Sequence, residues 1–447
     1  MSSRFHEASA IAPEPPSYRL ISRIAVTMMI ANFGQPLVAS VATVISGYMP
    51  DTAAIGGVAI GSFLFTFLFQ MFVFLRMAMV GFAAQEAGRG DALALRDTFW
   101  RVAFVALAIG LVLLAGGLPA RAFILPLIAK SEAIVVPAGE YFSTRMWTLP
   151  LALVNAVAYG YLLGIQRVTL SLVLQACAAF SSIALSFIFV LWLDGRVVGL
   201  AAAAAVTDVL SSVLLFLVLR RDAALGAGLP AIPALFRGTH LRALLVVNRD
   251  LFVRTFALIL AIAWFMRASA GSGEILLAAN TILLTVQSFV GFGIDGFSNA
   301  GQTLLGHAVG RRSPATLEVI VRRVLLLAGG FALCVGLLLL VLGPLFLPLM
   351  TDKPPVQEAM LRYLPWLAVM PLAIVGGFIF DGLFLGATLT RETRNAMLAA
   401  VAVFFAAVPL LQGIWGNNGL WCAMLVLMAG RGFFLSLYMP RLKAAAT

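Results

Sequence analysis

The sequence contains few charged residues and especially few acids. Only 11% of the 447 residues are charged, with 19 Asp and Glu against 30 Lys and Arg, whereas a typical soluble domain has about 25%. The hydrophobic fraction is 62% and the mean hydropathy is +1.02. These values exclude a water-soluble enzyme, a disordered chain and a fibre, and they predict an integral membrane protein in contact with the lipid bilayer. The net charge of +11 is then a sign of orientation in the membrane, and we predict no nucleic-acid partner.

Residues that carry metal or nucleophilic chemistry are also scarce. Cys177, Cys334 and Cys422 lie far apart inside apolar runs, and the three histidines form no metal-ligand cluster. The sequence has no phosphate-binding loop, and residues 1–20 lack the pattern of a cleaved signal peptide. We therefore predict that the protein is not an enzyme and has no metal and no cofactor. A membrane-embedded lipid transferase and a non-transporting receptor or scaffold are the alternatives from other classes.

Apolar runs between Gly, Pro and charge clusters predict an all-α protein with twelve transmembrane helices. Each run has room for the roughly 20 apolar residues that cross a bilayer. The runs begin near residues 20, 53, 97, 135, 168 and 197, and then near residues 250, 275, 317, 356, 393 and 417. The longest connection divides the chain into a cytoplasmic tail (1–19), an N-lobe of six helices (20–221), a cytoplasmic linker (222–249), a C-lobe of six helices (250–440) and a cytoplasmic tail (441–447).

Basic residues predict the orientation of these helices. The side of the two termini and the even-numbered connections carries 21 Lys and Arg, and the opposite side carries seven. Because cytoplasmic loops are enriched in Lys and Arg, we expect both termini in the cytoplasm. The protein is then a multi-pass protein of the inner (plasma) membrane, and we expect it to be a monomer.

Three landmarks recur at nearly one offset, which indicates an internal duplication. They are Gly88-Arg89 with Gly310-Arg311 (222 residues apart), Pro150 to Val154 with Pro371 to Val375 (221), and Gly160 to Gly164 with Gly382 to Gly386 (222). Since six helices per copy is an even number, both copies enter the membrane in the same direction. We therefore expect a pseudo-twofold axis along the membrane normal and a substrate site between the two lobes.

Ionisable residues in the middle of a span are costly and are functional candidates by default. The acids are Asp208, Asp295 and Asp381, and we take these three as the candidates for coupling to a cation. The bases are Arg76, Arg145 and Arg431, which we interpret as interfacial side chains or ties between helices.

The eighth span has one polar face. Its members fall within about 120° of one another on a helix, and they are Asn280, Gln287, Gly291, Asp295, Ser298, Asn299 and Gln302. Such a stripe does not face lipid, so it lines either a water-filled cavity or the interior of a lobe. Asp381 follows Pro371 and Gly376-Gly377. There, freed carbonyls beside a carboxylate are able to coordinate a cation, although a packing kink with a neutral Asp is the alternative. Asp208 fits either role.

The N-terminal half has polar surfaces almost without carboxylates. Its first and fifth spans carry Asn, Gln, Thr and Ser, which bind polar groups but exchange no proton near neutral pH. Across both halves the residues expected to line the cleft are Asn280, Gln287, Asn299, Gln302, Gln35, Asn32, Asn155, Ser182 and Ser186. Pro36, Pro150 and Pro371 are expected to bend their helices.

Many short segments in order resemble one family. They are Gln35 to Leu37, Ala54 to Gly61, Phe74 to Met77, Ala84 to Arg89, Tyr141 to Arg145, Pro150, Gly160 to Gly164, Gln166-Arg167, Asn248 to Asp250, Arg254, Leu277 to Asn280, Asp295-Gly296, Ala300 to Gln302, Phe380 to Ala387, Thr390, Arg394 and Asn395. From about residue 20 to 440 the sequence is similar to the DinF-like branch of the MATE (multidrug and toxic compound extrusion) family. The resemblance implies the MATE/MOP-type fold, with two six-helix lobes around a V-shaped cleft.

The sequence departs from the family pattern in the N-lobe. The family's usual first-helix aspartate falls on Ala42, and its fifth-helix Asn and Asp fall on Ser182 and Ser186. Gln302 stands where bacterial relatives often have Glu, and the Ala-Gly-Gln version resembles plant members that move organic anions. These departures put the family's N-lobe coupling site in doubt for this chain.

The predicted function is secondary active transport by alternating access. We expect export of small drug-like or xenobiotic organic compounds by antiport with H+ or Na+, with the coupling carboxylate in the C-lobe. The alternative is a transporter or uniporter of the same superfamily with altered coupling, which takes an organic anion or a lipid-linked substrate.

Overall fold

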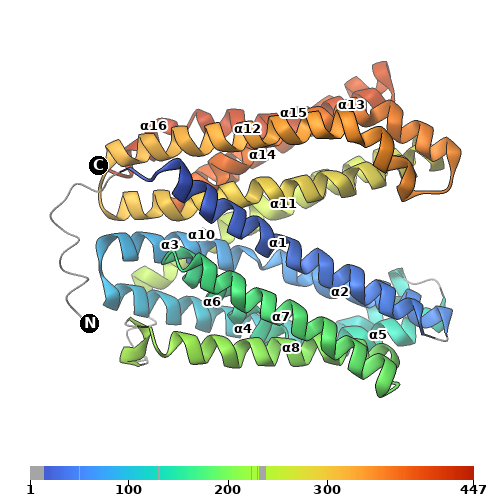
Figure 1. The fold of residues 1–447 in the computed structure, drawn as a ribbon, viewed down its shortest axis with the longest axis horizontal. Helices are drawn as coiled ribbons and strands as arrows, with labels where there is room; N and C mark the ends of the chain where they lie inside the picture. Colours follow the sequence, from blue (N-terminus) through green and yellow to red (C-terminus); the bar gives the residue numbers. More distant parts are fainter. Residues whose placement is uncertain (1–14, 50, 129–130, 223, 229, 231–237) are drawn as a thin grey trace. The chain divides into compact units, whose positions relative to one another are not determined.

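The chain folds almost entirely into long helices (Figure 1). The computed structural model describes residues 15–447, except residues 50, 129–130, 223, 229 and 231–237. The first elements are α1 (Tyr18–Gly47), α2 (Thr52–Met71), α3 (Phe74–Arg89), α4 (Ala92–Ile128), α5 (Glu132–Met146), α6 (Leu149–Gly164), α7 (Val168–Phe187), η3 (Ile188–Trp192), α8 (Arg196–Leu219) and η4 (Leu225–Ala227). They are followed by α10 (Gly238–Ala270), α11 (Glu274–Gly310), α12 (Pro314–Phe346), η5 (Leu347–Met350), α13 (Pro354–Gly386), α14 (Thr390–Trp415), α15 (Asn417–Ser436) and α16 (Met439–Ala444).

The helices confirm the predicted membrane spans. Among the described residues, 11 helices are long and apolar enough to cross a membrane, and α5 with α6 forms a twelfth span that is bent by 52°. The break lies at residues 147–148, directly before Pro150 in the first turn of α6. Proline has no backbone N–H to donate and clashes with a preceding helical turn, which explains why one span is built from two helices. Pro36 and Pro371 lie inside α1 and α13, each of which continues on both sides.

The helix that contains the seventh span begins before the predicted span. That span is predicted from about residue 250, after a linker of residues 222–249, and α10 begins at Gly238. Residues 242–249 are Arg-Ala-Leu-Leu-Val-Val-Asn-Arg, a mixture of charge and good helix formers. Hydropathy does not detect such a segment, although it favours a helix.

Contacts divide the chain into two compact units. Unit 1 contains residues 249–447, Gly88–Gly90 and the described residues up to Met29, and unit 2 contains residues 30–87 and 91–248. The first part of α1 therefore belongs with the C-terminal helices rather than with the N-lobe expected from the sequence. Gly296 of α11 explains this, because a side chain there would overlap the carbonyl oxygen of Ala25.

The internal duplication is visible as the same helix contact in each unit. In unit 2 a side chain added at Gly160 or Gly164 would lie closer than 3.0 Å to the backbone oxygen of Arg76 or Val80, respectively. In unit 1, Gly382 and Gly386 approach the backbone oxygens of Ser298 and Gln302 equally closely. Ser298 and Gln302 follow Arg76 and Val80 by 222 residues, which is the offset of the glycines. Small residues four apart let two membrane helices pack with their backbones in contact.

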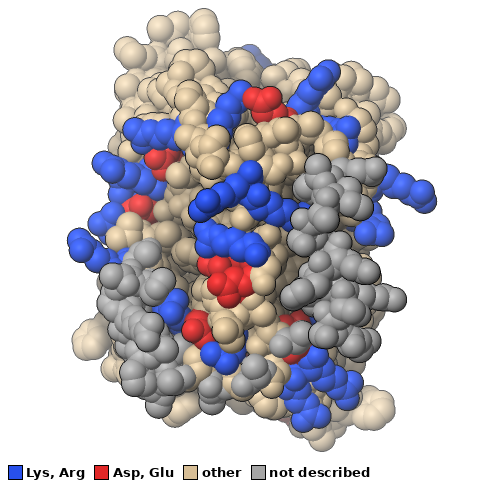
Figure 2. Space-filling view, turned by 90° about the vertical axis from the view of Figure 1, so that its left-hand side faces the viewer, with Lys and Arg blue, Asp and Glu red and all other residues tan. Residues whose placement is uncertain are grey.

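Unit 1 has basic side chains at the end that carries the C-terminus. Lys and Arg side chains are spread over the face in Figure 2, which is the end where the C-terminus lies. In unit 1, Arg441 pairs with Glu392 at 2.8 Å and Lys443 pairs with Glu318 at 2.6 Å. Arg323 donates to the Pro16 carbonyl at 2.7 Å and lies over the Tyr18 ring, so this end also holds the start of α1.

Candidate functional site

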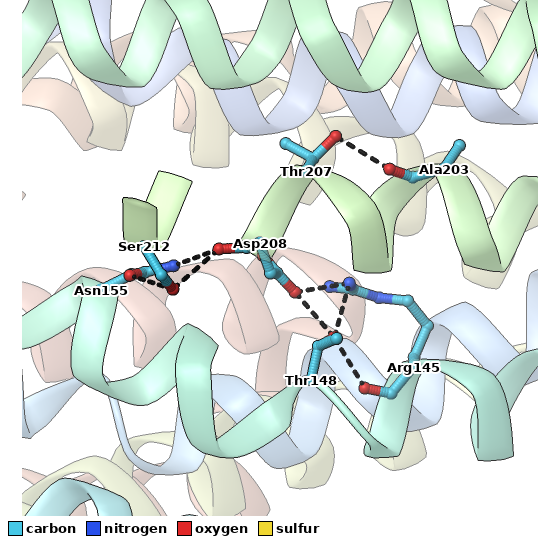
Figure 3. A network of polar contacts seen from close by, with 7 residues as sticks. All are labelled: Arg145, Thr148, Asn155, Ala203, Thr207, Asp208 and Ser212. Carbon is cyan, nitrogen blue, oxygen red and sulfur yellow. Dashed lines mark hydrogen bonds and ion pairs between the residues drawn. The ribbon is translucent and has the colours of Figure 1, made fainter. Parts of the chain in front are cut away.

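In unit 2 the mid-span acid Asp208 meets the break between α5 and α6 (Figure 3). The Nη1 atom of Arg145, in the last turn of α5, donates to Oδ2 of Asp208 at 2.6 Å. The hydroxyl of Thr148, which lies in the break, is 3.0 Å from the same oxygen and 3.2 Å from the Arg145 carbonyl. Arg145 and Asp208 were both noted in the sequence, but nothing there indicated that they form a pair.

A second set of contacts fixes the backbone of α8 at Asp208. Asn155 of α6 donates from Nδ2 to the Asp208 carbonyl at 2.9 Å, and the Ser212 hydroxyl is 2.9 Å from both Asn155 Oδ1 and that carbonyl (Figure 3). The Thr207 hydroxyl donates to the carbonyl of Ala203 at 2.8 Å. Asn155 was expected to line a cleft. Instead, it is buried and ties α6 to α8 within unit 2.

Arg145 also contacts a third helix of unit 2. Its guanidinium carbon lies 4.1 Å from the centre of the Phe65 ring in α2. A guanidinium over an aromatic face is stabilised by the negative charge density of the ring. The cation therefore has two partners, the Asp208 carboxylate and the Phe65 ring.

In unit 1, Asp381 of α13 lies between two arginines. Arg254 of α10 donates from Nε to Oδ1 at 3.3 Å and from Nη2 to Oδ2. Arg431 of α15 donates from Nη2 to Oδ2 at 2.5 Å, and its guanidinium lies 5.2 Å from the Phe378 ring. All three side chains are buried, with 10% or less exposed. This Arg254–Asp381–Arg431 triad ties three helices together and carries one net positive charge.

The triad contradicts the expected environment of Asp381. The sequence suggested loosened carbonyls around a cation-binding carboxylate, or else a neutral Asp at a kink. Both carboxylate oxygens are instead occupied by guanidinium groups, and α13 continues as a helix through Gly376 and Gly377. Those glycines serve packing, since Gly376 touches the backbone of Gly432 and Gly377 lies against Arg431. The close approach of α15 is what brings Arg431 to Asp381.

The polar face of α11 serves two different purposes. Near its start, Asn280 is fully buried and belongs to a closed amide network. It donates to Ser269 of α10 and to Asn417 of α15, both at 2.7 Å, and its oxygen accepts from Trp421 at 2.9 Å. Asn280 therefore ties helices together, and it does not line a cleft as expected from the sequence. A helical pattern shows that a side chain avoids lipid but not whether it meets protein or water.

Further along α11, Asp295 is half-buried and bonded to a neutral amide. Asn299 Nδ2 is 2.8 Å from both the side-chain Oδ2 and the backbone carbonyl of Asp295. Ser298 donates to the Phe378 carbonyl of α13 at 2.7 Å, and Gln302 is buried. Gln287 is also buried, and its side-chain oxygen has no hydrogen-bond partner among the described residues.

The polar residues expected to line the N-terminal half are placed as follows. Ser182 and Ser186 are buried in α7, and Ser186 donates to the Ser182 carbonyl at 2.7 Å. Asn32 is half-buried in α1, and the side chain of Gln35 lies outside the described part of the structure. Ala42 packs against an apolar cluster that includes Ile45, so its surroundings suit the residue that replaces the family's usual aspartate.

Sequence reasoning missed Arg254 as a site residue. Hydropathy put the start of the seventh span near residue 250, which left Arg254 at the membrane edge, but α10 continues for a further 12 residues on its N-terminal side. A signal was available, since Arg254 lies four residues inside the span predicted from residue 250, and a charge inside the membrane needs a partner of opposite sign such as Asp381. In the described part of the chain, no group of three or more His, Cys, Asp or Glu could hold a metal.

Comparisons with known proteins agree with this arrangement. The MatE family model matches residues 27–188 and 252–411, which cover most of both halves of the duplication. The chain is 31% identical over 422 residues to the DNA damage-inducible protein F of Escherichia coli, covering 94% of this chain and 91% of that protein. It is 26% identical over 306 residues to Protein DETOXIFICATION 43 of Arabidopsis thaliana, covering 68% of this chain and 57% of that protein.

A solved structure has the same fold. It is the outward-facing conformation of a multidrug resistance MATE family transporter of the MOP superfamily, with a TM-score of 0.83 and 19% identity. The match covers 95% of this chain and 96% of that one. The resemblance noted in the sequence motifs is thereby confirmed: the chain belongs to the MatE family, and it is a membrane transporter rather than an enzyme.

Proposed function

We propose that the protein is a secondary active transporter that exports small organic compounds by antiport with H+ or Na+. Family membership supports transport, and two similar proteins bear the names multidrug resistance transporter and DETOXIFICATION. The two compact units and the duplicated helix contacts suit alternating access, in which two similar halves move about a site between them.

The observation that carries the coupling proposal is the environment of Asp295. Its side chain is half-buried on a polar helix face, and the Asn299 amide holds it at 2.8 Å. A carboxylate in this setting is able to take up a cation on one side of the membrane and release it on the other. Asp381 is less suited to this role, because only 5% of its side chain is exposed and it lies between two guanidinium groups, whereas Asp295 is half-buried. We therefore assign the coupling in unit 1 to Asp295.

The test is gradient-driven transport in proteoliposomes that contain the purified full chain. A cationic fluorescent dye is the transported probe, and pH and Na+ gradients are imposed separately. Asp295→Asn is expected to reduce gradient-driven dye transport to the rate measured without a gradient. Glu274→Gln, on the exposed start of the same helix, is the matched control and should transport like the wild type. A wild-type rate in Asp295→Asn would reject the assignment.

The Ala42→Asp variant tests the site that the family usually has and this chain lacks. In our proposal, coupling is already present in the wild type and does not depend on this position. Gradient-driven transport should therefore run in the wild type without the added acid. If only Ala42→Asp showed coupling, the residue at position 42 would be the determinant and the assignment to Asp295 would be wrong.

One observation favours a second candidate function. The Arg254–Asp381–Arg431 triad has one more positive than negative charge inside the membrane-spanning part of unit 1. A net positive centre suits an organic anion or a lipid-linked anionic substrate rather than a cation, with altered coupling or uniport. Counterflow in the same proteoliposomes, with cationic dyes compared with small carboxylates, separates the two functions. Exchange of carboxylates but not of dyes would replace the first proposal.

We also propose that both termini lie in the cytoplasm of a cell whose inner (plasma) membrane holds the protein as a monomer. The support is the concentration of Lys and Arg at the end of the molecule that carries the C-terminus (Figure 2). A fluorescent protein that folds only in the cytoplasm, fused after Thr447, should become fluorescent. A periplasmic phosphatase fused at the same point should stay inactive.

A further inference from the structure

Asp208 has one carboxylate oxygen that is still open. All of its side-chain contacts, to Arg145 Nη1 and Thr148 Oγ1, go to Oδ2. Within the described residues Oδ1 makes no hydrogen bond or ion pair, and 20% of the side chain is exposed. Asp381 differs, since both of its oxygens are occupied and only 5% of its side chain is exposed. Asp208 is therefore an acid within a membrane protein that has one acceptor atom not used by any described residue.

The pair lies halfway along a broken span. The α5–α6 span covers residues 132–164, and its break at residues 147–148 is flanked by Arg145 and Thr148. Interrupted helices near the middle of the membrane are where many transporters place their ion sites, because the break exposes backbone groups and allows movement. In this chain the side chains of Arg145 and Thr148 link the break to the Asp208 carboxylate. The bend is thereby tied to the charge of one residue.

Arg145 has a second partner, the Phe65 ring, when Asp208 loses its charge. Its guanidinium already lies 4.1 Å from the Phe65 ring, which stabilises a cation without a carboxylate. The second contacts of Asp208 use its backbone carbonyl, which Asn155 and Ser212 hold. Neutralising the side chain therefore releases Arg145 and Thr148 while α8 stays anchored to α6.

We propose that Arg145, Thr148 and Asp208 form a proton-operated latch on the bend between α5 and α6. Oδ1 of Asp208 accepts a proton from hydronium, which leaves water and a neutral carboxyl group. Arg145 then shifts to Phe65 and the α5–α6 bend relaxes. Loss of the proton restores the ion pair and the bend. Asp208 is the proton-binding residue, and Arg145 and Thr148 are positioning residues. As a part of the coupled transport cycle, the latch rests on the proposed function.

The neighbouring groups are compatible with proton exchange at this acid. From α5, the charged Arg145 and the phenol of Tyr141 face Asp208, and from α6 the phenol of Tyr159 does so. Arg76 of α3 and Cys177 of α7 act on Tyr159, one step further away. The α2 sequence contains no titratable residue. Of these groups Asp208 is the carboxylic acid, and the others are phenols, a thiol and guanidinium groups.

The first test measures the bend without any transported substrate. Spin labels are attached through Val136→Cys in α5 and Thr169→Cys at the start of α7, both exposed positions on either side of the break. The background replaces Cys177, Cys334 and Cys422 by Ser. The distance between the labels should change between acidic and mildly alkaline buffer in the wild-type background. Asp208→Asn should show the acidic distance in both buffers, and Asp194→Asn, in an exposed ion pair of the same unit, should behave like the wild-type background.

Asp208→Asn leaves Arg145 without its carboxylate, and this loss can prevent folding. A second variant keeps the test decisive in that case. Asp208→Asn combined with Arg145→Gln removes both charges, so that no charge is left unpaired in the membrane. This double variant should fold and should also lose the pH-dependent change in distance. A change that persists in either variant, or that is missing in the wild-type background, would overturn the latch.

Dye transport separates failure of the latch from failure of the proposed function. Transport driven by a pH gradient should fall in Asp208→Asn to the rate without a gradient. Equal transport by the wild type and Asp208→Asn would reject the latch but leave the proposed function standing. No gradient-driven transport in the wild type, with a label distance that responds to pH only when Asp208 is present, would reject the function and keep the latch.

Discussion

The two units place an acid in the middle of the membrane in opposite ways. Asp381 in unit 1 is enclosed by two arginines and is 5% exposed. Asp208 in unit 2 has a single arginine and is 20% exposed. Each acid ties three or four helices, but only Asp208 has an oxygen left open and lies at a broken helix. The comparison indicates that the same kind of ion pair serves as a fixed tie in one unit and as a movable contact in the other.

The largest effect should come from neutralising the two acids. Asp381→Asn leaves two buried guanidinium groups without their carboxylate, and breaking a buried pair costs about 3–5 kcal/mol. Asp208→Asn should cost clearly less, because Arg145 keeps the Phe65 ring as a partner and is nearer to water. The measurement is the apparent melting temperature of each purified variant in detergent. Equal losses would show that Asp208 is as firmly locked as Asp381, and the comparison would fail.

The charged residues in the middle of the spans show which features of the site the sequence predicts and which it does not. Asp208, Asp381, Arg145 and Arg431 were all identified as mid-span charges. Their pairing was not predicted, because the partners are 63, 50 and 127 residues apart in the chain. Which side chains meet depends on how helices rotate and how closely they approach, and the close approach at Gly376 and Gly432 is an example. A hydropathy pattern contains neither quantity.

The fold was more predictable than the site for a physical reason. Spanning a bilayer requires about 20 apolar residues. Each span is therefore visible in the sequence as an apolar run, and the duplication repeats the pattern of runs. The bend before Pro150 also has a local cause. Asn280, by contrast, shares a helix face with Asp295, but it lies in a closed amide network while Asp295 is half-buried. Position along the helix axis distinguishes the two residues, and helical periodicity does not contain it.

The scaffold around the acids should be equivalent in the two units, and paired glycine substitutions test this. Gly160→Ala and Gly382→Ala each place a methyl group closer than 3.0 Å to a backbone oxygen. Overpacking of this kind costs about 1–3 kcal/mol, so both variants should melt earlier by similar amounts. Gly329→Ala is the control, since no atom lies within 4 Å of its added carbon. Unequal losses would place part of the asymmetry in the helix packing rather than in the ion pairs.

Amide ties provide a finer comparison of the units. Asn280→Ala leaves Ser269, Asn417 and Trp421 without partners inside unit 1, at a cost of about 1–3 kcal/mol for each buried group left unsatisfied. Asn155→Ala should cost less, because Ser212 remains to bond the Asp208 carbonyl. The measurement is the melting temperature of the Asn280→Ala and Asn155→Ala variants in detergent. A greater loss of stability in Asn155→Ala would contradict this ranking. It would show that the stability of unit 2 depends mainly on the hydrogen bond from Asn155 to the Asp208 carbonyl, rather than on the latch residues.

The smallest effects should come from exposed ion pairs. Asp194→Asn in unit 2 and Glu318→Gln in unit 1 each remove one partner of an exposed ion pair. Exposed pairs are screened by salt and contribute little, so neither variant should change the melting temperature or the gradient-driven dye transport measurably. This result would show that the difference between the units lies in their buried acids. A clear loss of transport in one of the two variants would instead place part of that difference in the exposed charges, which contact the water phase from which the coupling ion comes.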